Sequence, residues 1–374
     1  MRRSMILATA ALAASGLLLA GCSNDSDSSG DGSGTAGGSS ESSAAKVGVI
    51  LPDSKSSARW ETADRKYLEE AFQAAGVDYD IQNAQGDKTQ FQTIADQMIT
   101  SGVNVLMIVN LDSGSGKAVL SKAQAQGIST IDYDRLTLGG GADFYVSFDN
   151  VAVGNLQGEG LEKCLTDAGT TTANIVYLNG SPTDNNATLF KQGAVEALQP
   201  QIDSGAYTVV ADQAVPDWDN QQAGTIFEQM WTDQGGNIDG VLAANDGLGN
   251  AAIAILKKNG VNGTVPVTGQ DATDQGLQNV LAGDQCMTVY KAVKKEADAA
   301  AALAVALATG ADTADLAPDS VTDSESGEDV QAVLLEPEAI YFDNVKDVIA
   351  DGYTTVENVC TAELADKCAE AGIS

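Results

Sequence analysis

Residues 103–134 decide the fold and read VNVLMIVNLDSGSGKAVLSKAQAQGISTIDYD. Two apolar runs of strand length, 103–110 and 130–134, flank a segment with helical apolar spacing at 118–126. A strand, a helix and a second strand in this order form a βαβ unit, whose two strands run parallel. Gly127 follows the helix and supplies the left-handed residue that commonly ends one. This stretch therefore predicts an α/β fold with a parallel sheet.

The same alternation continues on both sides of this unit. We expect strands at 47–51, 79–82, 145–149, 173–178, 207–210, 240–244 and 265–269. We expect helices at 62–75, 89–100, 187–198, 220–232, 251–259 and 293–309. Two successive α/β units predict two Rossmann-like lobes with parallel sheets. The late apolar segments at 333–335 and 340–342 are too short for a lobe, so we expect them to return across a three-stranded hinge.

The amino terminus indicates export. Arg2 and Arg3 precede an apolar stretch at 5–19, which is too short to span a bilayer comfortably. Leu19-Ala20-Gly21-Cys22 follows, which predicts a lipoprotein signal peptide over 1–21 and lipidation of Cys22; an ordinary signal peptide with an incidental cysteine is the alternative. Residues 22–45 are mostly Ser, Gly, Asp, Ala and Thr, which predicts a flexible linker.

Composition excludes several classes of function. The formal net charge is −32, so the surface repels nucleic acid and anionic lipid headgroups. The chain has no histidine, which excludes Ser-His-Asp and Cys-His catalysis and histidine-ligated zinc. Residues 112–117, DSGSGK, only superficially resemble a phosphate-binding loop, because Leu111 and Ala118 stand where Gly and Ser or Thr are needed.

The remaining four cysteines are best interpreted as disulfide candidates in an oxidising compartment. Cys360 and Cys368 lie eight residues apart in a polar tail and could close a small loop. Cys164 and Cys286 would then form the second pair, although Cys164 could equally be a buried free thiol.

Most strand-like runs end in hydrogen-bonding residues. The ends in question are Asn110, Arg135, Asn150, Asp246 and Asp271. In doubly wound α/β sheets ligands bind beyond the carboxyl ends of the strands, so these ends predict a binding site. Asn, Asp, Arg and Lys with flanking Trp suit a neutral polyol, because hydroxyl pairs donate and accept while a C–H face packs on an aromatic plane. Catalysis by a carboxylate pair, as in glycosidases, is the alternative.

Eight short motifs in order carry a family resemblance. They are Arg59-Trp60, Tyr133-Asp134-Arg135, Ser147-Phe148-Asp149-Asn150, Gly180-Ser181-Pro182, Asp184-Asn185-Asn186-Ala187, Asn245-Asp246, Gly269-Gln270-Asp271 and Thr288-Val289-Tyr290-Lys291. From about residue 47 to 351 the chain resembles the D-xylose-binding receptors of the type I periplasmic-binding-protein family. These are soluble receptors of ABC sugar importers, and no motif is specific alone.

The resemblance implies a sugar held between two closing lobes, without catalysis or a cofactor. The ligand-binding residues that it implies are Arg59, Trp60, Asp134, Arg135, Asn150, Asn185, Asn186, Trp218, Asn245, Asp271 and Lys291. Trp60 and Trp218 would form opposed aromatic faces. Asp149, Asp246 and Gln270 would either contact the ligand or cap loops. Thr188 stands where we expect a long basic residue, which bears on the preferred sugar.

We therefore expect a lipid-anchored extracytoplasmic monomer that delivers a monosaccharide, D-xylose or a related aldose, to an ABC permease. The expected lobes are 46–152 with 292–325 and 153–291 with 326–351, followed by a tail over 352–374. Two alternatives remain at this point: a sugar sensor for a membrane signalling receptor and an exported glycoside hydrolase.

Overall fold

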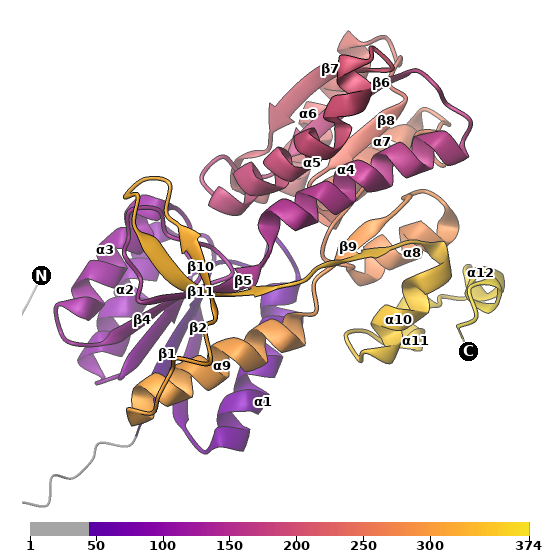
Figure 1. Cartoon of the computed structure of the whole chain (residues 1–374). Coiled ribbons are helices and arrows are strands. Elements are labelled where there is room, and N and C mark those ends of the chain that lie inside the picture. The colour runs from indigo at the N-terminus through magenta and orange to yellow at the C-terminus, as the bar shows by residue number, and fades with distance from the viewer. Residues whose placement is uncertain (1–44, 374) are drawn as a thin grey trace, which may run out of the picture. The chain divides into compact units, whose positions relative to one another are not determined.

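The computed structural model describes residues 45–373, which contain two α/β lobes (Figure 1). The predicted leader, the predicted lipidation site Cys22 and the linker up to residue 44 lie outside the described residues. Within the described part of the chain, no helix combines the length and hydropathy that a membrane crossing requires.

The first lobe is built on a seven-stranded sheet with helices on both faces. Its strands are β1 (Lys46–Leu51), β2 (Asp78–Asn83), β3 (Val105–Ile108), β4 (Ser129–Tyr133), β5 (Phe144–Phe148), β10 (Asp319–Thr322) and β11 (Asp329–Leu335), in the order β10-β11-β5-β4-β3-β1-β2. Only β10 runs antiparallel to its neighbour. One face packs against α1 (Arg65–Ala75) and α9 (Val293–Thr309), the other against α2 (Lys88–Thr100) and α3 (Ser113–Gln124). Burial on both faces explains why β3 is entirely apolar.

The second lobe is built on a three-stranded parallel sheet in the order β7-β6-β8. Its strands are β6 (Ala173–Asn179), β7 (Tyr207–Ala214) and β8 (Gly240–Ala243). Its helices are α4 (Asn150–Asp167), α5 (Asn185–Asp203), α6 (Asn220–Asp233), α7 (Asp246–Lys258) and α8 (Asp274–Ala282). A separate antiparallel pair joins β9 (Thr288–Tyr290) to β12 (Glu338–Ile340).

The chain crosses between the lobes three times, after β5, after β9 and after β11 (Figure 1). These crossings form the predicted three-stranded hinge. The last one lies later than expected: β11 pairs with β5, so residues 329–335 belong to the first sheet and not to the second lobe. The apolar face of β11 completes the first core, which the local sequence could not reveal.

Several further elements differ from the predictions, among them α4, α8 and the strand at 265–269. Helix α4 was not predicted, because Gly154, Gly158 and Gly160 lower its helix propensity. These glycines allow close packing: a Cβ at Gly154 would lie 2.0 Å from the carbonyl oxygen of Phe190 in α5. The predicted strand at 265–269 is absent except for a bridge from Val267 to Val241.

The carboxyl-terminal segment packs on α8 and contains α10 (Val345–Ala350), followed within the tail by α11 (Val356–Val359) and α12 (Ala365–Glu370). A disulfide joins Cys360 to Cys368 within it. A second disulfide joins Cys164 in α4 to Cys286 before β9. Of the two alternatives for Cys164, the structure therefore contains the paired form.

Candidate ligand-binding site

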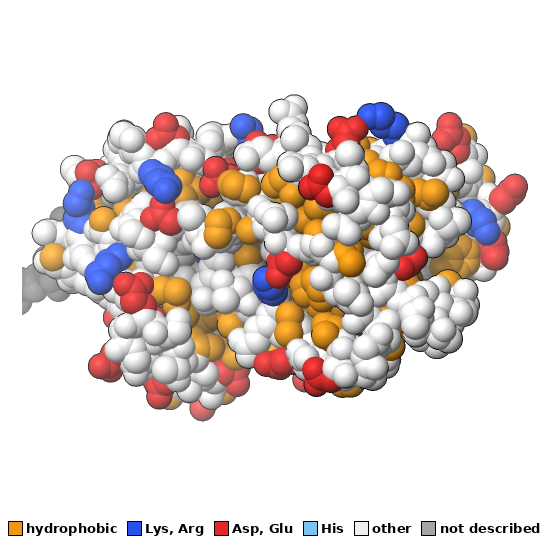
Figure 2. Space-filling model, turned by 90° about the horizontal axis from the view of Figure 1, so that it is seen from above, with side chains coloured by type: hydrophobic (Ala, Val, Ile, Leu, Met, Phe, Trp, Pro, Cys, Tyr) orange, Lys and Arg blue, Asp and Glu red, His pale blue; other side chains and the backbone are white. Residues whose placement is uncertain are grey.

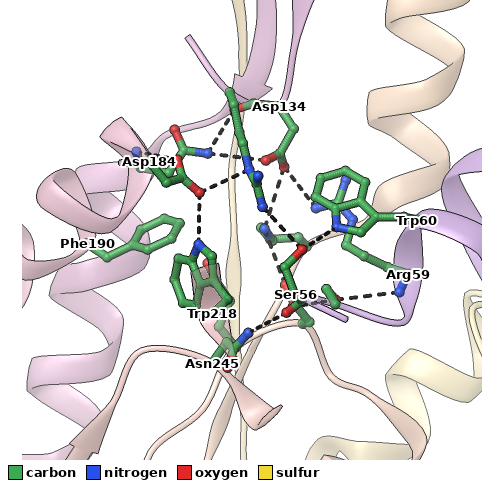
Figure 3. Close-up of a pocket in the computed structure, with 14 residues that line it drawn as sticks. Ser56, Arg59, Trp60, Asp134, Asp184, Phe190, Trp218 and Asn245 are labelled. Atoms are coloured by element: carbon green, nitrogen blue, oxygen red, sulfur yellow. Dashed lines mark hydrogen bonds and ion pairs between the residues drawn. The ribbon is translucent and has the colours of Figure 1, made fainter. Parts of the chain in front are cut away.

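A small cavity of about 30 Å³ lies between the lobes, beyond the carboxyl ends of strands from both sheets (Figure 3). The residues that line it are Ser56, Ser57, Arg59, Trp60, Asp134, Arg135, Asp184, Asn186, Phe190, Trp218, Asn245, Gln270, Asp271 and Lys291. Parallel strands bring their carboxyl ends to one edge of a sheet, so two lobes facing each other at those edges create a single polar chamber.

Nine of the eleven residues predicted to bind ligand line this cavity; the exceptions are Asn150 and Asn185. Asn150 is buried outside the lining and donates to Tyr145 Oη and Asn186 Oδ1, both at 3.1 Å. Asn185 begins α5 and lines a different hollow, next to Leu189. Neither is placed to contact a ligand in the cavity.

The structure also adds residues that sequence reasoning did not select for the site: Ser56, Ser57, Asp184 and Phe190; of the residues expected either to contact the ligand or to cap loops, Gln270 lines the cavity. The two serines lie in the loop after β1, so a search of every strand end would have found them. Asp184 caps α5 directly before the predicted asparagines. No local sequence pattern marks Phe190 as a site residue, because an apolar residue in a predicted helix is normally assigned to the hydrophobic core. Thr188 is exposed and does not line the cavity, so its identity says nothing about the preferred sugar.

Arg59 anchors the first-lobe wall through a buried network of carboxylates. Its guanidinium donates to Asp64 (2.9 and 2.7 Å), Glu296 (2.6 Å) and Asp134 (3.0 Å). Tyr133 Oη donates to the same Asp64 at 2.7 Å. Burial raises the pKa of Glu296, although Arg59 acts in the opposite direction. These bonds use four of the five N–H groups of Arg59 and orient Asp134, while Arg59 itself lines the cavity.

Trp60 forms the aromatic part of the first wall. Its Nε1 donates to Ser56 Oγ at 2.9 Å. The guanidinium carbons of Arg59 and Arg135 lie 4.6 and 5.4 Å from the ring centroid, within the range of cation–π attraction. The indole is therefore held in one orientation from its edge and its face.

Trp218 forms the aromatic part of the second wall, across the cavity from Trp60 (Figure 3). Its Nε1 donates to Asp184 Oδ2 at 3.1 Å, and its ring meets Phe190 edge-on with centroids 6.4 Å apart. The ring lies directly over Gly180, where a Cβ would be 2.1 Å from its Cη2 atom. Both Trp218 and Asp217 have positive φ angles, 55° and 54°. Tertiary packing must hold this strained turn, since such backbone is costly for non-glycine residues.

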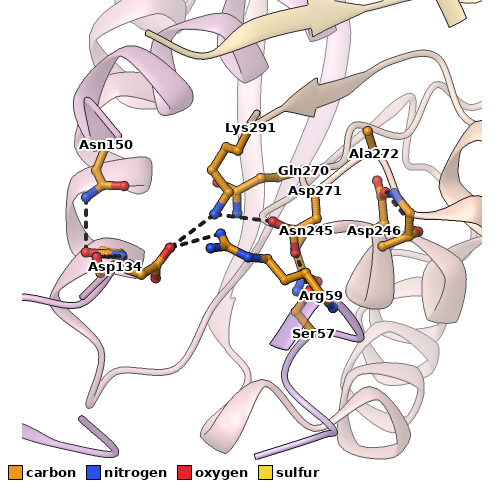
Figure 4. A network of polar contacts seen from close by, with 12 residues as sticks. Ser57, Arg59, Asp134, Asn150, Asn245, Asp246, Gln270, Asp271, Ala272 and Lys291 are labelled. Carbon is orange, nitrogen blue, oxygen red and sulfur yellow. Dashed lines mark hydrogen bonds and ion pairs between the residues drawn. The ribbon is translucent and has the colours of Figure 1, made fainter. Parts of the chain in front are cut away.

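Lys291 lies between carboxylates of the two lobes (Figure 4). Its Nζ is 3.3 Å from Asp271 Oδ1 and 3.7 Å from Asp134 Oδ2. A second ion pair joins Arg135 to Asp184 at 3.0 Å. Burial acts to raise the pKa of Asp134, but Lys291, Arg59 and Arg135 together lower it. Asp134 is therefore an ionised acceptor at neutral pH.

Direct hydrogen bonds close the lobes over the cavity. They join Ser57 Oγ to Asp271 Oδ2 (2.8 Å), Asn245 Nδ2 to the Ser56 carbonyl (3.1 Å) and Asn186 Nδ2 to the Asp134 carbonyl (2.8 Å). Gln270 Oε1 is buried without a hydrogen-bond partner, which leaves an acceptor for a ligand hydroxyl. Within residues 45–373, no group of three or more carboxylates and thiolates is arranged to hold a metal.

Three comparisons place this architecture among known proteins. A family model described as a periplasmic binding protein domain matches residues 47–312. The D-xylose-binding periplasmic protein of Escherichia coli (strain K12) is 36% identical over 310 residues, 82% of this chain and 90% of that protein. The multiple sugar-binding periplasmic protein SbpA of Azospirillum brasilense is 35% identical, over 83% of this chain and 89% of that protein. An ABC transporter solute-binding protein from Clostridium phytofermentans with bound β-D-glucose has a TM-score of 0.75 and 28% identity, covering 84% and 99% of the two chains.

Proposed function

Because the chain belongs to the periplasmic binding protein family, we propose that it is an extracytoplasmic receptor that captures a monosaccharide and delivers it to an ABC importer. Members of this family are binding proteins and not enzymes. One observation carries the proposal: two indoles and a set of amide, carboxylate and cationic groups from both lobes line one cavity.

The groups in the cavity suit a neutral sugar ring. Asp134 and Asp271 accept from hydroxyl groups, while Lys291 and Asn245 donate to them. Charge-assisted hydrogen bonds of this kind are the stronger ones in a dry site. Asp and Glu side chains are spread over the face of the molecule seen in Figure 2, and the strongly negative chain disfavours anionic ligands such as sugar phosphates.

A sugar in the cavity would stabilise the closed arrangement of the lobes. The bonds from Ser57 and Asn186 across the cleft form only when the lobes are together. A ligand that contacts both walls binds the closed state better than the open one and shifts the population toward it. We propose the lobes around the two sheets as the units that move and the three crossings as their hinge.

We propose D-xylose as the preferred ligand. The supporting observation is that the E. coli relative, 36% identical to this chain, is named for this sugar. The test is calorimetry of the purified protein with D-xylose, D-ribose, D-glucose and xylitol. Tightest binding of D-xylose supports the proposal, and tighter binding of D-glucose would replace it with a hexose receptor. A separate incubation with aryl glycosides tests the alternative: turnover supports a glycoside hydrolase, and no turnover excludes hydrolysis of these substrates.

We propose further that Cys22 carries a lipid that anchors the protein to the cell membrane. The supporting feature is the order of a basic region, an apolar stretch and Leu19-Ala20-Gly21-Cys22. Mass spectrometry of the membrane-extracted protein should find a diacylglycerol adduct on Cys22. A Cys22→Ser variant should be released into the soluble fraction, and an unmodified Cys22 in the native protein contradicts the anchor.

Transport and sensing are separated by a deletion strain. Loss of xylose uptake at limiting concentrations supports delivery to an importer. Normal uptake with a lost transcriptional or chemotactic response to xylose assigns the protein to signalling.

A further inference from the structure

The disulfide-containing tail shares an apolar cluster with the turn that presents Asp271 to the cavity. Helices α11 and α12 both contact α8, which follows this turn. The buried tail residues Val359, Cys368 and Ile373 share one apolar cluster with Ala272, whose side chain is fully buried. The neighbour of a proposed ligand residue thus belongs to the same apolar cluster as buried residues of the last twenty.

The turn itself is strained. Asp271 and Ala272 have φ angles of 94° and 47°, in the region that non-glycine residues rarely adopt. Such backbone persists only when the surrounding structure determines it. Three hydrogen bonds hold the backbone of the turn. Asp271 N donates to the Val289 carbonyl (2.9 Å), Ala272 N to Thr288 Oγ1 (3.2 Å) and Thr273 N to Asp246 Oδ2 (2.8 Å). Figure 4 shows Asp271 pointing from this turn toward Lys291. In addition, Ala272 is buried in the apolar cluster that the tail helps to form.

The tail and the residue directly before it also contact the two segments that carry Asp271 and Lys291. Tyr290, directly before Lys291, donates to Asp351 Oδ2 at 2.6 Å and meets Tyr353 edge-on with ring centroids 5.3 Å apart. The contacts with α8 are a hydrogen bond from Thr354 Oγ1 to Asp274 and one from Gln278 Nε2 to the Asn358 carbonyl (2.8 Å). The Cys360–Cys368 disulfide closes the tail after these contacts and limits its freedom to unpack.

We propose that the disulfide-closed tail is a positioning element of the ligand site, which holds Asp271 and Lys291 in their binding orientation and thereby sets affinity. This inference rests on the proposed function. Asp271 reaches across the cleft to Ser57, so a small relaxation of its turn weakens both the ligand contacts and the closure contact. The physical principle is preorganisation: a site that must be ordered on binding binds more weakly.

The test uses the full chain with Cys360→Ser and Cys368→Ser together, and separately Thr354→Val. Calorimetry with D-xylose, or with the tightest-binding sugar of the panel, is done at a temperature where near-ultraviolet circular dichroism shows both variants folded. We expect Kd to rise about tenfold in the double variant and severalfold in Thr354→Val, with faster dissociation.

Two controls separate positioning from a general loss of stability. The Cys164→Ser and Cys286→Ser variant loses the other disulfide, whose Cys286 packs against a different apolar cluster, and should keep Kd within twofold. Lys367→Gln removes an exposed tail ion pair with Glu370 and should also keep Kd. A lower melting temperature with an unchanged Kd in the tail variants overturns the inference, as does equal weakening in both disulfide variants.

Failure of the proposed function can be distinguished from failure of the positioning role of the tail. If the wild type binds no sugar, that function fails, and amide hydrogen exchange at residues 271–273 tests the tail by itself. Faster exchange in the Cys360→Ser and Cys368→Ser variant than in wild type supports positioning, and equal exchange overturns it.

Discussion

The two walls of the cavity are held in different ways. In the first lobe, buried charges orient one another: Arg59 donates to Asp64, Glu296 and Asp134. In the second lobe, strained turns at residues 217–218 and 271–272 present Trp218 and Asp271, and packing holds the backbone. The first wall therefore depends on keeping charges paired, whereas the second depends on keeping its supporting side chains in place.

The largest effect should come from breaking the first wall with Arg59→Met. This change leaves three carboxylates in a buried site without their common cation, and removing one partner of a buried ion pair costs about 3–5 kcal/mol. Urea denaturation should show a loss of stability of this size. The control is Arg65→Met, which removes a partly exposed pair with Glu61 and should cost about 1 kcal/mol or less. Equal losses of stability in both variants would mean that the buried network of Arg59 contributes no more to stability than the partly exposed pair of Arg65.

The pH dependence of stability can be compared between the lobes, because each contains a buried carboxyl group with a raised pKa. Burial raises the pKa to about 7 for Asp132 in the first lobe and for Asp246 in the second. The folded state then holds these protons more tightly than the unfolded state, where the pKa is about 4. The contribution of these two groups to stability is complete below about pH 4, falls as pH rises from about 4 to 7, and is absent above.

Asp132→Asn should therefore reduce the stability difference between pH 5 and pH 8 by up to about 2.5 kcal/mol. Asn retains the size of Asp132 and can still bond to Thr137. Urea unfolding at the two pH values measures this difference, with the exposed Asp96→Asn as control. A pH dependence identical to wild type would show that Asp132 does not titrate in this range.

The second wall can be broken without touching a charge. Trp218→Ala should weaken sugar binding by about 1–3 kcal/mol, because a ring face loses its aromatic partner. Gly180→Ala should reproduce much of this loss, since the new Cβ would displace the indole that remains in the sequence. Calorimetry measures both. Wild-type affinity in Gly180→Ala would show that the indole can move without cost.

The smallest effect should be the difference in sugar affinity between variants of Asn150 and Asn185. Asn150→Ala removes hydrogen bonds to Tyr145 and Asn186 and should weaken binding by about 1 kcal/mol through misplacement of Asn186. Asn185→Ala should leave Kd within twofold, because Asn185 lies outside the cavity. A stronger effect from Asn185 than from Asn150 would contradict this geometry.

Local sequence was informative wherever a pattern repeats over short distances. The alternation around residues 103–134 appears in the structure as β3, α3 and β4, because apolar periodicity reflects which face of an element is buried. It failed at α4, whose glycines look unfavourable until their contact with α5 is known. It also assigned Asn185 to the site, because sequence order does not say which of two adjacent helix residues faces inward.

The sequence by itself therefore determined the two α/β lobes and the strand ends where polar residues gather, since both follow from local periodicity. Only the tertiary structure decided that Glu296, 237 residues from Arg59 and on an alanine-rich helix, completes the first wall. It also decided that tail residues share one apolar cluster with Ala272, the neighbour of Asp271. Ion pairs and packing between distant segments depend on the folded geometry, which no short stretch of sequence encodes.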